Sequence, residues 1–186
     1  FIAVLFFMGI VFGTLIVHSL GYQQRADLFY YFQQFLVELD KDEALDVRYV
    51  LFQNFFHYLK YTGIIWILGL SIIGLPIILI MLFLKGVFIG FTIGFLVHQL
   101  GAKGFAFSLV AVIPQNVIIV PTILVLSVLS ISFSLKLIAY LFGHKGYQHK
   151  PNIPKYVGVM FWVALLVFKV SLFQTYISPL LMKMLA

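Results

Sequence analysis

Cysteine and charged residues are what this sequence has least of. Of its 186 residues none is cysteine and 10% are charged, whereas 63% are hydrophobic. A soluble domain carries about 25% charged residues, so this chain has too few charges to cover a surface that faces water. The lack of cysteine excludes disulfides, a thiol nucleophile and thiolate metal ligands. The composition therefore excludes a soluble globular enzyme and predicts an all-α, polytopic membrane protein.

Acidic residues are scarce too, and they lie together. All six fall between Asp27 and Asp46, whereas the chain outside residues 21–48 carries nine lysines and no carboxylate side chain. The net charge of +6 thus comes from lysines that are distributed along the chain, and it does not form a patch for nucleic acid. We do not expect nucleic acid as a partner. The expected surroundings are the lipid bilayer, with the acidic segment on one side and a lysine-rich loop on the other.

Long apolar runs predict about five transmembrane helices in a single membrane domain, residues 1–186. A span needs about 20 residues, so longer runs have to be divided. Proline and glycine break helices, and we place broken helices between Gly74 and Pro76 and between Pro114 and Asn116. The predicted spans cover residues 1–20, 53–74, 76–99, 105–142 and 156–178.

The distribution of lysines predicts the orientation. Short loops rich in Lys and Arg stay in the cytoplasm, so the loop 143–155 is expected inside, together with the N-terminus. The segment 21–52 and the C-terminus are then extracytoplasmic. If Pro76 only kinks one helix that ends at Lys85, residues 87–113 instead form a re-entrant hairpin. The chain opens on an apolar run without the basic region of a signal peptide, so we expect a truncated first span that lacks a cytoplasmic extension.

Glycines recur every four residues in two of the predicted spans. Gly86, Gly90 and Gly94 share one face of the third span, and Gly9 and Gly13 repeat the spacing in the first. Small residues let helix backbones approach closely in lipid. We favour packing within one chain, with the seam of a homodimer as the alternative.

Polar residues inside the predicted spans need partners. Lys85 and Lys169 have no intramembrane carboxylate to pair with, so each either extends to the headgroups or has a functional role. A buried lysine would need backbone carbonyls, a lipid phosphate or an acid from another chain. Ser127, Ser130 and Ser134 share a face and are expected to bond between helices.

The break that contains Gln115 and Asn116 is predicted within the hydrocarbon. Its freed backbone groups must be packed in protein or line a polar cavity. A structural kink is favoured. A transporter or lipid-handling permease, with a site formed by this break and Lys85, is the alternative.

Nothing in the sequence indicates catalysis. His18, His57 and His98 are isolated from one another, and acid–base or nucleophilic chemistry needs a base that a third group orients. The acidic segment lacks the glycine and terminal glutamate of an EF-hand. We therefore expect no enzyme activity, no metal and no cofactor.

Three stretches resemble the stage II sporulation protein M family of endospore-forming bacteria. They are residues 6–17 (FFMGIVFGTLIV), the apolar run 59–97, and PQNVIIVP at 114–121 with FSLKLI at 133–138. The resemblance implies a protein of the sporulation septum and the engulfing mother-cell membrane. It also implies a non-catalytic role in anchoring two peptidoglycan hydrolases: stage II sporulation protein D, a lytic transglycosylase, and stage II sporulation protein P, an amidase.

The extracytoplasmic segment is the sizeable surface that could receive such partners. Leu28, Phe32, Phe35 and Leu39 recur at spacings of three and four, which predicts an amphipathic helix next to the acidic residues. The residues we expect to bind partners are Phe29, Phe32, Phe35, Asp40, Asp42, Glu43 and Asp46.

Overall fold

The computed structural model describes residues 1–41, 47–141 and 153–183. Within these ranges it leaves undescribed the side chains of residues 35–41, 47–50, 107, 110, 111, 113–115, 173 and 176–183. All six elements in the described ranges are α-helices, and no strand occurs there, as predicted. They are α1 (Ile2–Ser19), α2 (Tyr22–Lys41), α3 (Val47–Gly69), α4 (Gly74–Ala111), α5 (Ile113–Leu141) and α6 (Ile153–Lys183).

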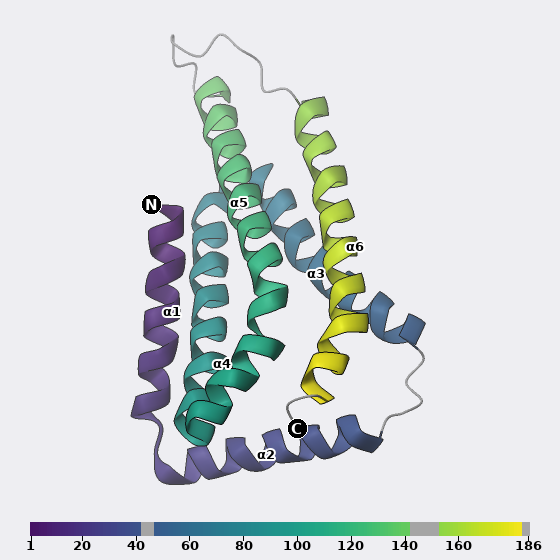
Figure 1. Ribbon diagram of the computed structural model, residues 1–186. Helices are drawn as coiled ribbons and strands as arrows, with labels where there is room; N and C mark the ends of the chain where they lie inside the picture. The colour runs from purple at the N-terminus through teal and green to yellow at the C-terminus, as the bar shows by residue number, and fades with distance from the viewer. Residues whose placement is uncertain (42–46, 142–152, 184–186) are drawn as a thin grey trace.

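The bundle is formed by α1, α3, α4, α5 and α6, and α2 lies across one of its ends (Figure 1). α1 and α4 run side by side in the same direction. α5 runs in the opposite direction, and α6 has the direction of α4. α3 crosses α5 and α6 obliquely. The end of α5 and the beginning of α6 therefore lie at the same end of the bundle as the beginning of α1.

Among the described residues four helices are long and apolar enough to cross a membrane, one fewer than the prediction of about five spans. The four segments are Ile2–Ser19, Gly74–Ala106, Asn116–Leu141 and Ile153–Leu172. The predicted span 53–74 is the one without a counterpart among them. Its helix, α3, carries Gln53, Asn54, His57 and Lys60 in consecutive turns. These polar residues leave an apolar run that is too short to match the bilayer.

The break near Gly74 and Pro76 falls where α3 ends and α4 begins. Residues 70–73 form a turn in which the Leu70, Ser71 and Gly74 amides donate to carbonyls three residues earlier. Pro76 lies in the first turn of α4, where backbone N–H groups have no acceptor within the helix. The N–H that proline lacks therefore costs no helical hydrogen bond. A Cβ at Gly74 would collide with the Leu68 carbonyl oxygen, so the tight turn requires glycine at this position.

The second break takes a different form from the predicted kink within a span. α4 is kinked at Gly101, where the backbone is non-helical with a positive φ of 58°, and it ends at Ala111. α5 begins at Ile113, so Pro114 lies at the start of a helix, where proline is tolerated. This junction lies near the end of the bundle that α2 covers (Figure 1).

The hydrophobic core lies between α3, α4, α5 and α6. It contains Tyr58, Ile65, Ile78, Leu82, Ile119, Ile123, Leu126, Val163, Val167 and Val170. None of these ten residues comes from α1, whose extensive contacts are with α4. The attachment of α1 therefore depends on the α1–α4 interface.

Candidate interaction surfaces

The α1–α4 interface is formed by the predicted glycines. Gly9 and Gly13 of α1 face Gly86 and Gly90 of α4, and all four are buried. A Cβ at Gly90 would collide with the Ile10 carbonyl oxygen, and a Cβ at Gly86 with that of Phe6. The backbones thus touch, an approach that residues with side chains would prevent. The structure places the glycine face against α1 of the same chain.

One polar side chain adds to this interface. Thr14 donates its hydroxyl to the Ile10 carbonyl at 3.0 Å and lies 3.4 Å from the Gly90 carbonyl oxygen. A Cβ at Gly94 would lie 3.3 Å from the Thr14 Cα, which is tighter than an ordinary van der Waals contact and would require a shift of a few tenths of an ångström. The hydroxyl is satisfied within its own helix, so it adds no unpaired polar group to the interface.

A second interface joins α3, α5 and α6 around Tyr156. The Tyr156 hydroxyl donates to the Trp66 carbonyl oxygen at 2.8 Å and lies 2.9 Å from the Ser130 hydroxyl. The Trp66 indole donates back to the Tyr156 carbonyl oxygen at 3.2 Å. The Tyr156 ring stacks on the rings of Trp66 and Phe133, with centroids 5.6 and 4.2 Å away. Hydrogen bonds and stacking therefore hold three helices together at one point.

Sequence reasoning found the serines of this interface and missed the aromatic residues. Ser130 bonds with Tyr156, and Ser134 donates to the Ser71 carbonyl oxygen at 3.0 Å. Ser127 is fully buried, and its hydroxyl has no partner in the described part of the chain. Trp66 and Tyr156 lie 90 residues apart, and nothing in their local patterns indicates that they meet.

Lys85 lies on α4 beside an aromatic ring of α3. Its ammonium lies 5.7 Å from the centre of the Tyr61 ring, within the range of a cation–π contact. The Tyr61 hydroxyl donates to the Met81 carbonyl oxygen at 2.8 Å, which fixes the ring against α4. Lys85 is half-buried, whereas Lys169 on α6 is exposed.

Asn116 is satisfied locally. Its side-chain amide donates to the Val112 carbonyl oxygen at 2.7 Å, and its backbone amide donates to the same oxygen at 3.4 Å. The side chain of Gln115 lies outside the described part. The structure does not bring Asn116 together with Lys85 by any described contact.

α2 is attached to the bundle through Arg25. The guanidinium donates to His98 Nε2 at 3.1 Å and to the His18 carbonyl oxygen at 2.9 Å. The rings of His18 and His98 meet edge to face, 5.5 Å apart. Two histidines that the sequence indicates as isolated therefore lie together where α1, α2 and α4 meet.

The predicted partner-binding residues are described in part. Phe29 and Phe32 are half-buried on α2, whereas Tyr30 and Tyr31 between them are 58% and 67% exposed. The side chains of Phe35 and Asp40 lie outside the described part, as do Asp42, Glu43 and Asp46 altogether.

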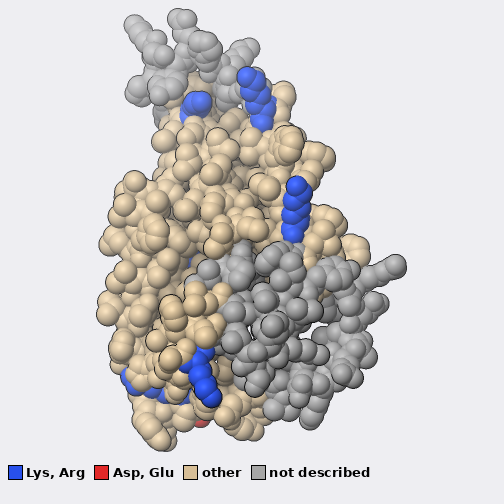
Figure 2. All heavy atoms as spheres, in the orientation of Figure 1, with Lys and Arg blue, Asp and Glu red and all other residues tan. Residues whose placement is uncertain are grey.

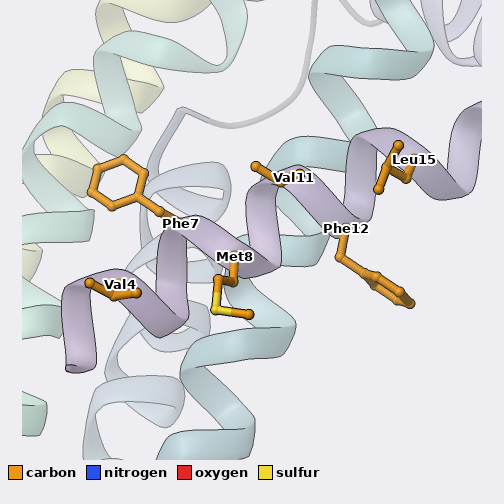
Figure 3. Close-up of a pocket in the computed structure, with 6 residues that line it drawn as sticks. All are labelled: Val4, Phe7, Met8, Val11, Phe12 and Leu15. Atoms are coloured by element: carbon orange, nitrogen blue, oxygen red, sulfur yellow. The ribbon is translucent and has the colours of Figure 1, made fainter.

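The visible surface between the two ends of the molecule is almost free of charge (Figure 2). On α1 it contains a shallow apolar groove of about 450 Å³ (Figure 3), lined by Val4, Phe7, Met8, Val11, Phe12 and Leu15. Each of these side chains is more than half exposed. Such a face is stable against lipid and unstable against water. No group of His, Asp and Glu suited to a metal occurs among the described residues.

Fold and surface together define a multi-pass α-helical membrane protein. The family model of stage II sporulation protein M matches residues 2–179, nearly the whole chain, and the chain belongs to this family. The resemblance found in the sequence is thereby confirmed, and the chain is a sporulation-related membrane protein. No curated protein and no solved structure is significantly similar to it.

The α1–α4 interface can be tested by cross-linking, because the chain has no cysteine of its own. A Cβ at Gly94 would lie 3.6 Å from the Thr14 Cβ, within the range of about 3.5–4.5 Å that disulfides require. The double variant Thr14→Cys, Gly94→Cys should form a disulfide within one chain on oxidation. Non-reducing electrophoresis should show a monomer of altered mobility. A covalent dimer as the main product would instead place the glycine face between two chains.

The Tyr156 interface can be tested by removing one hydroxyl. Tyr156→Phe keeps the stacking but leaves the Trp66 carbonyl and the Ser130 hydroxyl without this partner, so it should destabilise the protein by about 0.6–2 kcal/mol. Thermal unfolding in detergent measures the effect. Tyr140→Phe, on the exposed surface of α5, is the control and should leave the Tm unchanged. Equal Tm values for wild type and Tyr156→Phe would show that the hydroxyl contributes nothing.

Proposed function

We propose that this protein is a non-catalytic membrane anchor that holds peptidoglycan hydrolases at the sporulation septum. The family supports a role in sporulation at a membrane. The anchoring role, the lytic transglycosylase and amidase as partners, and the part played in septal thinning and engulfment are our inference from that membership. The bundle holds its own helices together and presents a polar helix, α2, at one end (Figure 1).

The observation that carries the proposal is the placement of α2. Arg25 fastens the beginning of the helix to α1 and α4, and the following turns carry exposed tyrosines. Exposed aromatic side chains bury a large area at little entropic cost, so they are frequent in protein interfaces. The acidic residues that follow would select a partner surface of positive charge and speed its approach.

The orientation we propose places α2 on the extracytoplasmic side, where peptidoglycan lies. Lys136 and Lys155 lie on α5 and α6 toward the opposite end of the bundle, and lysine-rich short loops stay in the cytoplasm. α2 lies at one end of the bundle, and the end of α5 and the beginning of α6 lie at the other (Figure 1), so α2 and these two helix ends are placed on opposite sides. In this orientation α2 can reach hydrolases that act outside the membrane.

Co-purification from sporulating cells tests the anchoring role. Replacing Tyr30 and Tyr31 by Ala removes exposed side chains without opening the core, and should reduce recovery of the two hydrolases about tenfold, which corresponds to ~1.4 kcal/mol. Charge reversal of Asp40, Asp42, Glu43 and Asp46 should have the same effect.

The matched control is Tyr140→Ala, which removes an exposed tyrosine from α5 and should leave recovery unchanged. Undiminished recovery of both hydrolases with the α2 variants would contradict the proposed surface. Failure to recover either hydrolase with the wild-type protein would contradict the anchoring role itself.

A further inference from the structure

Lys85 lies deep in the longest apolar segment of the chain. It follows Gly74, where α4 begins, by eleven residues, which is about 16 Å of helix at 1.5 Å per residue. The hydrocarbon core of a bilayer is about 30 Å thick, so an α4 that enters it at Gly74 carries Lys85 close to its middle. A lysine stem reaches about 6 Å towards the helix N-terminus and cannot take the charge to the headgroups from that depth.

None of the described residues gives Lys85 a counter-charge. All six acidic side chains lie between Asp27 and Asp46, in a segment outside the four apolar helices. The contact that the structure gives the ammonium is the ring of Tyr61 at 5.7 Å. A cation–π contact lowers the cost of a buried ammonium but does not neutralise it. The Tyr61 hydroxyl already donates its hydrogen bond to the Met81 carbonyl oxygen.

The face of α4 next to Lys85 is apolar and exposed. Ile77, Ile80, Leu84 and Phe88 follow one another at spacings of three and four and are 38–67% exposed. This spacing places them in one stripe along the helix. A second helix that packed along the stripe would pass beside the half-buried ammonium of Lys85.

We propose that Lys85, Tyr61 and this stripe bind a membrane-spanning helix of another protein that carries a carboxylate side chain near its centre. The carboxylate would pair with the ammonium, and the helix would cover the stripe. Charge complementarity and depth favour this occupant over a lipid phosphate, which remains at the headgroups. The inference rests on the proposed anchoring function, since it assigns a second contact to a membrane-anchored partner.

The test uses the full chain in neutral phosphatidylcholine vesicles and a designed probe. The probe is a leucine-rich transmembrane peptide with one central Glu, and its twin has Gln at that position. Energy transfer between labelled protein and labelled peptide measures association. The Glu peptide should bind about tenfold more tightly than the Gln peptide. Equal binding of the two peptides by the wild-type protein would overturn the proposal without any variant.

Variants locate the site. Lys85→Met should abolish the preference for Glu, whereas Lys169→Met, which replaces the exposed lysine of α6, should retain it. Lys85→Glu should reverse the preference in favour of a peptide with central Lys, which guards against a variant that merely misfolds. A Glu preference that survives in Lys85→Met would place the contact elsewhere.

Vesicles of anionic lipid test whether a lipid phosphate, and not a peptide carboxylate, pairs with Lys85. Phosphatidylglycerol vesicles should leave the Glu preference intact if Lys85 receives a carboxylate in the hydrocarbon. Loss of the preference in these vesicles would show that lipid phosphate occupies the site and would overturn the proposal. The assay contains no hydrolase, so its failure is distinguishable from a failure of co-purification from cells.

Discussion

The structure depends on the fact that hydrocarbon offers neither hydrogen bonds nor a hydrophobic drive for helices to associate. Helices in lipid must therefore be held by close backbone contact and by polar groups that satisfy one another. The bundle uses both means. Glycine brings α1 against α4, and Tyr156 joins α3, α5 and α6 through hydrogen bonds and stacked rings. Groups that neither means satisfies are then candidates for binding something else.

Patterns that repeat along one helix were predictable from the sequence. The glycines at 86, 90 and 94 mark a contact face because of their spacing alone, and Pro76 marks a boundary between helices because proline lacks an N–H. The predicted span 53–74 has no counterpart among the four apolar helices, because the prediction combined the apolar end of α3 with its polar beginning. Contacts between distant residues, such as Trp66 with Tyr156 or Arg25 with His98, could not be predicted, since no local pattern relates the two members of each pair.

The scarcity of acidic side chains acquires a physical meaning in the fold. Carboxylates in this chain belong to the segment with α2, at one end of the bundle, while the apolar helices contain none. One consequence is that the apolar helices supply no carboxylate to pair with Lys85. Another is that the acidic residues lie next to the exposed aromatic residues of α2 in the sequence. Both consequences agree with the proposed anchoring role.

Site-specific photo-crosslinking in sporulating cells tests the anchoring role most directly. A photoreactive residue in place of Tyr31, on the exposed part of α2, should form adducts that mass spectrometry identifies as peptidoglycan hydrolases. The same residue in place of Tyr140, on the exposed surface of α5, should form none. Adducts at Tyr31 that contain no hydrolase, or hydrolase adducts of equal yield at both positions, would contradict the account.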